Sequence, residues 1–142
     1  MILQTMTIDD LNKISNTLSN FDNFWTIGVF KEELNNTNTH YIIAIDDDNI
    51  VGFGGISVVL DESTLNNIAV RIDKRNQGIA SHILEELINL SKSLNCSFIT
   101  LEVNITNSPA IKLYEKFGFK NLGIRRNYYH GNTDAYIMTL EL

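Results

Sequence analysis

Residues 75–80 of this chain are Arg-Asn-Gln-Gly-Ile-Ala, and they connect an apolar segment that ends at Val70 to a long periodic segment that begins at Ile79. A turn at the beginning of a helix exposes several backbone N–H groups and so offers an anion site. Gly78 lets a phosphate approach that backbone with no Cβ in the way, and Arg75 would add a charged fork. We therefore expect residues 75–80 to cradle a diphosphate.

Two other interpretations of the same segment are a plain turn and a nucleotide-binding P-loop. A glycine between a strand and a helix is more often simple turn chemistry, so the segment needs support from the rest of the chain. The P-loop is excluded because no Gly-Lys-Ser or Gly-Lys-Thr follows.

The flanking segments indicate a helix between two strands. Apolar residues recur at helical spacing from Ile79 to Leu94, and residues 98–103 form an apolar, β-branched run. The strand that ends at Val70 and the strand at 98–103 should therefore be parallel and joined by a right-handed crossover.

Elsewhere short apolar runs alternate with polar turns. Thr7 is an expected helix N-cap with an acid at the third helical position. Ser108 is expected as the N-cap of a later short helix, with Pro109 at its first position and Gly118 as its left-handed terminator. The other predicted elements are an opening strand, helices at 8–18 and 27–34, strands at 41–45, 50–60, 64–70, 119–126 and 133–140, and turns at 46–49 and 61–63.

This order, βααβββαβαββ, predicts an α/β fold with a mixed sheet. In such sheets ligands bind where neighbouring strands separate at their carboxyl ends.

The composition limits the class of protein. With 142 residues and 44% hydrophobic content, residues 1–142 are expected to form a single domain with its own core. The net charge of -6 opposes binding to nucleic acid and suits an amine or a basic peptide, although such a charge also serves solubility alone. No apolar stretch approaches the ~20 residues that cross a bilayer. No secretory signal is recognisable, so we expect a cytoplasmic protein without a membrane role.

Arg75-x-x-Gly78-x-Ala80 resembles the Gln/Arg-x-x-Gly-x-Gly/Ala pyrophosphate motif of the GNAT acetyltransferases. Other residues between 64 and 119 also stand where that family expects them: Asn67-Ile68-Ala69-Val70, Leu101-Glu102-Val103, Asn107, Ala110, Leu113, Tyr114 and Phe117-Gly118-Phe119. Residues 123–129 and 134–138 resemble the C-terminal signature of the ribosomal-protein-alanine N-acetyltransferases, and Trp25 matches an aromatic of that subfamily. Ile72 departs from the family's usual proline and Arg75 from its frequent glutamine, but neither removes a backbone amide from the cradle.

The resemblance implies the GNAT acyl-CoA N-acyltransferase fold, with acetyl-CoA as cosubstrate and direct transfer of its acetyl group to an amine. Backbone groups near residues 68–70 would hold pantetheine and polarise the acetyl carbonyl, and a bulge there would free the needed N–H. Asn107 would bond the pantetheine arm, although by itself it could equally cap the following helix. The cofactor-binding residues expected on this basis are Ile68, Ala69, Val70, Arg75, Asn76, Gln77, Gly78, Ile79, Ala80 and Asn107.

Two side chains are candidates for proton transfer. Glu102 ends a predicted central strand, where a partly buried carboxylate could act as general base, and the matching glutamate of the resembled subfamily is its proposed base. Tyr114 resembles the family tyrosine that protonates the coenzyme A thiolate, and a phenol, with a pKa near 10, suits an alkyl thiol. The alternatives are an ordinary strand-end carboxylate and a buried structural tyrosine.

A covalent acetyl-cysteine route would need Cys96, which lies at the opposite end of the strand from Glu102 and has no adjacent base. We expect it to be a packing residue. His40, His82 and His130 lack metal-site spacing, so no metal site is predicted.

The expected acceptor is the N-terminus of a peptide or protein, by resemblance the alanine that begins a small-subunit ribosomal protein. Trp25, Tyr128 and Tyr129 are candidate walls for it, while Asp134 either holds its own loop or meets a basic side chain of the peptide. The alternatives are acetylation of a small amine on the same fold and a non-catalytic acetyl-CoA-binding module. Glu102 and Tyr114 argue against the latter, because binding alone needs neither group.

Overall fold

The computed structural model describes residues 1–15, 21, 27–129 and 133–142. Its seven strands form one sheet in the order β1-β2-β3-β4-β5-β7-β6. The strands are β1 (Ile2–Thr5), β2 (Thr39–Asp46), β3 (Asn49–Val59), β4 (Glu62–Val70), β5 (Phe98–Asn104), β6 (Lys120–Tyr129) and β7 (Thr133–Glu141). The helices are α1 (Leu11–Ser15), α2 (Ile27–Asn35), α3 (Ile79–Ser93) and α4 (Ser108–Lys116), with short 3₁₀ turns η1 (Ile8–Asp10) and η3 (Ile72–Lys74). The predicted order of elements and the mixed sheet are confirmed.

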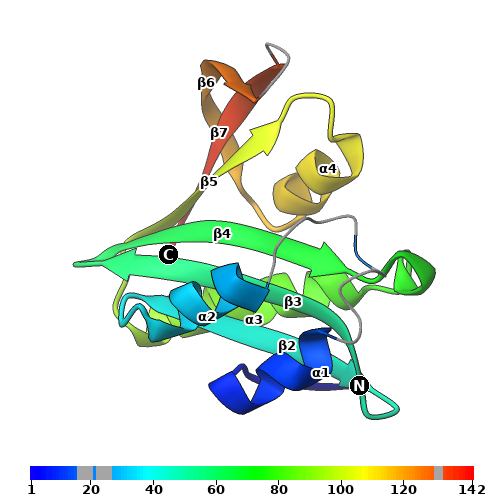
Figure 1. Ribbon diagram of the computed structural model, residues 1–142. Coiled ribbons are helices and arrows are strands. Elements are labelled where there is room, and N and C mark those ends of the chain that lie inside the picture. The colour runs from blue at the N-terminus through cyan, green and yellow to red at the C-terminus, as the bar shows by residue number, and fades with distance from the viewer. Residues whose placement is uncertain (16–20, 22–26, 130–132) are drawn as a thin grey trace.

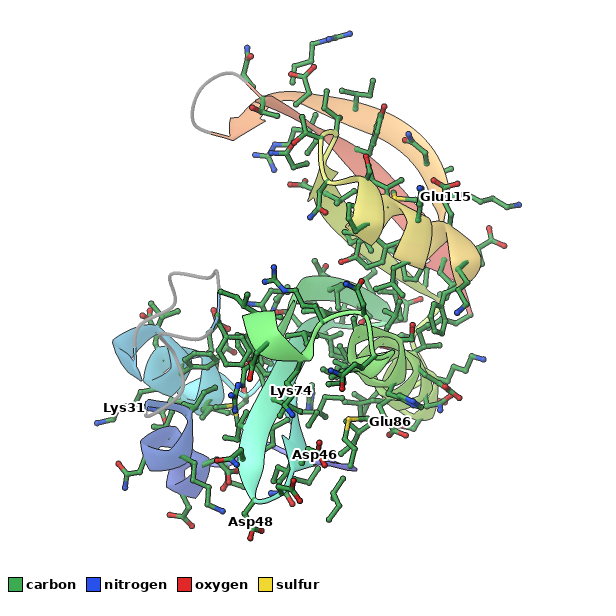
Figure 2. All side chains as sticks on the ribbon, turned by 90° about the vertical axis from the view of Figure 1, so that its right-hand side faces the viewer. Lys31, Asp46, Asp48, Lys74, Glu86 and Glu115 are labelled. Carbon is green, nitrogen blue, oxygen red and sulfur yellow. The ribbon has the colours of Figure 1, made fainter. Side chains whose placement is uncertain are left out.

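Helices cover both faces of the sheet. Figure 2 shows α2, marked by Lys31, on one side of the strands and α3, marked by Glu86, on the other. The α3 face holds the larger buried cluster, which α4 also joins through Tyr114. The α1/α2 face holds a second cluster that includes Phe30 and Phe53, whose ring centroids are 5.0 Å apart.

Close contact between α3 and β3 depends on a small residue at Gly54. A Cβ there would lie 2.6 Å from Ile83 Cγ2, well inside van der Waals contact. The apolar face of α3 therefore packs directly against the backbone of β3.

The feature that positions the site is the separation of β4 from β5. The two strands pair in parallel, as predicted, but only where Glu62–Thr64 faces Phe98–Thr100. Beyond Thr64 and Thr100 they diverge, and β5, β7 and β6 turn away from β4 with α4 beside them (Figure 1). The carboxyl ends of these strands therefore border an opening, as expected for a ligand site in a mixed sheet.

Several boundaries of secondary-structure elements differ from the predicted ones. The turn after β3 falls at residues 60–61 and not at 61–63, because Leu60 takes a left-handed conformation (φ 56°) and Ser63 already pairs with Val58 in the sheet. Leu94 lies just beyond α3 and is exposed. The expected end of the first helix near Leu18 lies outside the described residues.

The helix caps are partly as predicted. Thr7 forms a capping box, because Asp10 Oδ2 accepts from its backbone N–H at 2.8 Å. Gly118, with φ 95°, ends α4 as expected. The N-cap of α4 is Asn107 and not Ser108, since Asn107 Oδ1 accepts from the Ala110 N–H at 3.3 Å. Among the described residues no helix is long and apolar enough to cross a membrane.

Candidate active site

A groove of about 720 Å³ opens where β4 and β5 separate. It brings together three separate parts of the chain: the end of β4, the β4–α3 connection with the first turn of α3, and α4. The residues that line it are Ile68, Ala69, Val70, Lys74, Arg75, Asn76, Gly78, Ile79, Ala80, Ser81, Asn107, Pro109, Ala110, Leu113 and Tyr114. All predicted cofactor-binding residues except Gln77 are therefore in one place.

The β4–α3 connection has the geometry of an anion cradle. Asn76 and Gly78 have positive φ values of 63° and 80°, which turn the backbone sharply into α3. The first helical hydrogen bond of α3 runs from His82 N–H to the Gly78 carbonyl, so the N–H groups of residues 79–81 have no acceptor within the helix. A Cβ added to Gly78 would find no atom within 4 Å, which means that the space above this glycine is open to a ligand.

Two cations stand beside this cradle. Arg75 Nε donates to the Val70 carbonyl at 3.4 Å, which ties the side chain to the end of β4. Lys74 also lines the groove, and it is not among the cofactor-binding residues predicted from the sequence. A pair of basic side chains next to unpaired helix N–H groups fits a diphosphate group.

The end of β4 offers a backbone edge. Ile68, Ala69 and Val70 pair with β3 on one side, while the side toward β5 has no strand partner in the described chain. A bulge is present, but it lies at Asn66 and not at residues 68–70, because Ile56 faces Leu65 whereas the adjacent Gly55 faces Asn67. Backbone groups on this open edge are available to a ligand lying along the groove.

Tyr114 reaches the groove from α4. It is 9% exposed, and its ring packs against Phe119 with 5.7 Å between centroids. Asn107, at the beginning of the same helix, also lines the groove while its side chain caps α4. The position of Tyr114 suits a proton donor to a group held in the groove.

Glu102 lies on the other face of β5 from Tyr114. Leu101 and Val103, its neighbours in the strand, point into the cluster that contains Tyr114, so the alternation of the strand turns Glu102 away from it. The Glu102 side chain is 28% exposed and pairs with Arg125, whose Nη1 donates to Oε1 at 3.0 Å and to Oε2 at 3.2 Å. This ion pair was not foreseen, since it depends on β6 lying one strand beyond β7.

The candidate acceptor residues are only partly described. Asp134 accepts from the Asn127 N–H at 2.9 Å and from Arg126 Nη1 at 3.3 Å, so its carboxylate holds the irregular end of the β6–β7 hairpin. Trp25 and the side chains of Tyr128 and Tyr129 lie outside the described part of the structure.

Cys96 is buried, with 7% of its surface exposed. Burial, and to a lesser degree the negative charge of Asp61, raise the pKa of its thiol above the ordinary value. In the described part of the chain no three side chains of the types that bind metals come together.

Comparison with known proteins connects this geometry to a family. Residues 7–119 match the model of the Acetyltransferase (GNAT) family. A Bacillus subtilis protein, whose name provisionally assigns it the activity of a ribosomal protein bS18-alanine N-acetyltransferase, is 34% identical over 96% of this chain and 92% of its own. The ribosomal protein bS18-alanine N-acetyltransferase of Salmonella typhimurium is 43% identical over 68% of this chain and 67% of its own.

Solved structures agree. The crystal structure of the Escherichia coli ribosomal-protein-S18-alanine N-acetyltransferase has a TM-score of 0.88 and 33% identity, and the match covers 99% of this chain and 92% of that one. The crystal structure of Arabidopsis thaliana NAA60 in complex with acetyl-CoA has a TM-score of 0.87 over 99% of this chain and 98% of that one. At 19% identity, the second match shows a shared fold alone.

Proposed function

This chain belongs to the acetyltransferase (GNAT) family, and on that premise we propose that it moves the acetyl group of acetyl-CoA onto the α-amino group of an alanine that begins a small-subunit ribosomal protein. The reaction takes place in the cytoplasm, and residues 1–142 act as one domain. The relatives that are at least 33% identical support this acceptor, because several carry that activity in their names.

The observation that carries the proposal is the separation of β4 from β5. It opens a groove lined on one side by the cradle at residues 74–81 and on the other by Tyr114. Acetyl-CoA fits such a groove: its diphosphate meets the helix N–H groups with Lys74 and Arg75, and its pantetheine arm runs along the open edge of β4 toward Tyr114.

Each proton has an assigned place. Glu102, directly or through one water, takes a proton from the ammonium of the acceptor so that the neutral amine attacks the thioester carbonyl. A backbone N–H on the open edge of β4 stabilises the negative charge that develops on the carbonyl oxygen. As the carbon–nitrogen bond forms and the carbon–sulfur bond breaks, Tyr114 gives its phenolic proton to the departing thiolate. The attacking nitrogen, which is cationic after the addition, releases its second proton to solvent. The Tyr114 phenolate takes a proton back from solvent, which leaves the amide, free coenzyme A and a restored phenol.

The acceptor reaches Glu102 from the face of β5 opposite Tyr114. The exposed part of Glu102 makes this approach possible. A cationic N-terminus is attracted to the acidic chain, whose net charge is -6.

The test is to incubate the purified chain with acetyl-CoA and short peptides that differ only in their first residue, with mass spectrometry to locate the acetyl group. Acetylation of the α-amine of an alanine-first ribosomal peptide, with none on the same peptide blocked at its N-terminus, is the expected result. Glu102→Gln should lower that rate by about a hundredfold. Turnover of polyamines alone would identify a small-amine acetyltransferase, and acetyl-CoA binding without turnover on any amine would identify a binding module.

A further inference from the structure

The side-chain amide of Asn67 is buried and has no hydrogen bonds in the described structure, which is an arrangement that costs stability. Both its Nδ2 and its Oδ1 are buried, and neither has a hydrogen-bond partner in the described structure. A side-chain amide carries two donor hydrogens and an acceptor oxygen, and native proteins rarely leave such a group unsatisfied. A chain that keeps one accepts a loss of stability, which is typical of functional positions.

The adjacent residue shows that the local fold can satisfy an amide. Asn66, the bulged residue of β4, donates from Nδ2 to Ser57 Oγ at 2.8 Å. Asn67 follows directly and faces Gly55 in the register of β3. The difference between these two neighbouring asparagines therefore comes from the direction in which each side chain points.

The direction of Asn67 follows from its neighbours in β4. Ile68 packs against the buried cluster on the α3 face, whereas Ala69 packs against the cluster on the α1/α2 face. Because side chains alternate along a strand, Asn67 shares the α1/α2 face with Ala69. It therefore points away from the face that bears Tyr114 and α3.

Asn67 is level with Glu102 across the gap between the separating strands. The last parallel pair is Thr64 with Thr100, so continuing this register past the bulge at Asn66 places Asn67 opposite Glu102. Glu102 also points away from the face that bears Tyr114. The amide and the carboxylate thus lie on the same face of the sheet, which is the face from which the acceptor is proposed to arrive.

We propose that Asn67 binds the first peptide group of the acceptor and so selects a peptide N-terminus over a simple amine. The inference rests on the proposed acetyl transfer to a peptide. When the amine stands at Glu102, the peptide group that follows it is the next polar group to leave water. Asn67 Nδ2 donates to its carbonyl oxygen and Asn67 Oδ1 accepts from its N–H, which satisfies the amide and the peptide group together. Asn67 is partly exposed as a residue although its two amide atoms are buried, and the proposed contact requires its side chain to turn toward the acceptor.

The test pairs a change in the protein with a change in the substrate. Asn67→Leu keeps the branching and the number of heavy atoms of the side chain but removes its hydrogen-bonding groups, and Asn66→Ala is the control. The two substrates are an alanine-first peptide and its analogue in which an ester replaces the first peptide bond, which removes the N–H. KM and kcat for both substrates, KM for acetyl-CoA and the melting temperature are measured for each variant.

The expected pattern separates binding from structure. Wild type and Asn66→Ala should both show a KM for the ester analogue about tenfold above that for the peptide, and this ratio should vanish in Asn67→Leu. Asn67→Leu should raise the peptide KM by about tenfold with KM for acetyl-CoA unchanged. Its melting temperature should rise, since an unsatisfied buried amide is gone, whereas that of Asn66→Ala should fall.

Two results would overturn the inference, and they differ in whether the proposed function survives. If wild type acetylates the peptide but the ratio of ester to peptide KM is the same in Asn67→Leu, Asn67 does not bind the peptide group and the proposed function stands. If wild type acetylates amines but no peptide, the peptide acceptor and the role of Asn67 fall together. Should Asn67→Leu fail to fold, Asn67→Ala provides the same comparison.

Discussion

Arg125 holds the carboxylate of Glu102 from two strands away. Its Nη1 lies 3.0 Å from Oε1 and 3.2 Å from Oε2, although Arg125 is in β6, Glu102 is in β5 and β7 runs between them. In the sheet register Arg125 faces Ala135 and Glu102 faces Ile137, so the arginine side chain crosses the β7 surface to reach its partner. The proposed base is thus held by the β6–β7 hairpin, which also carries the candidate acceptor residue Asp134.

Arg125→Gln should lower kcat/KM by about tenfold, because the carboxylate loses the donor that orients it. Arg125→Lys should recover part of this loss, since it restores the charge but not the planar fork. The free energy of unfolding of both variants should lie within about 1 kcal/mol of the wild-type value, because the ion pair is partly exposed to solvent. Arg126→Gln is the control, as Arg126 contacts Asp134 and not Glu102. Equal losses in Arg125→Gln and Arg126→Gln would contradict an orienting role.

Tyr114→Phe should lower kcat by about a hundredfold while KM for acetyl-CoA stays close to wild type. The phenyl ring keeps the contact with Phe119, so the melting temperature should change little. Steady-state kinetics and thermal denaturation check both parts. A variant with full kcat would show that the thiolate obtains its proton elsewhere.

Gly78→Ala should weaken acetyl-CoA binding about tenfold, because a methyl group would stand where the phosphates approach the backbone. Gly118→Ala is the matched control: it also has a positive φ, of 95°, but its Cβ would face Leu140 Cδ1 at 3.4 Å. Each substitution should cost about 1–2 kcal/mol of stability from backbone strain. Calorimetric titration with acetyl-CoA distinguishes them, and equal affinities would argue against the cradle.

A buried pair of hydroxyl groups joins β4 to α3. Ser63 Oγ and Ser91 Oγ are 2.9 Å apart, and both residues are 0% exposed. Ser63→Ala or Ser91→Ala should lower the free energy of unfolding by about 1–2 kcal/mol, since each leaves the other hydroxyl without this partner. The double variant should lose less free energy of unfolding than the two single variants together.

Urea unfolding measures this cycle of variants. Ser93→Ala is the control, because its exposed hydroxyl donates to the carbonyl of Leu90 in the same helix. Strict additivity of the two single effects would mean that the hydroxyl groups do not depend on one another.

Cys96→Ala should keep wild-type kcat/KM, because the thiol takes no part in the proposed transfer. In the folded wild type, burial raises the pKa of this thiol, so it stays protonated to a higher pH than a free cysteine. Alkylation of Cys96 by iodoacetamide at neutral pH should therefore be slower than alkylation of free cysteine. The pH at which its rate rises should also be higher than for free cysteine. Rapid alkylation with a parallel loss of activity would support the covalent mechanism through an acetyl-cysteine.

Local features of the chain were predictable because they depend on residues close together in the sequence. The cradle needs only Gly78 between the end of β4 and the apolar periodicity of α3, and the αL terminator at Gly118 needs only the helix before it. The errors were also local: Asn107 and Ser108 are both good N-cap residues, and side-chain geometry alone decided for Asn107.

The sequence by itself thus determined the order of the elements and which residue types were available for phosphate binding and proton transfer. The tertiary structure decided that β4 and β5 part after Thr64, that Glu102 and Tyr114 occupy opposite faces of β5, and that Arg125 reaches Glu102. Each of these depends on the pairing and packing of residues distant in the chain. Periodicity shows that a side chain alternates with its neighbours, but only the packed sheet shows what lies on either side of it.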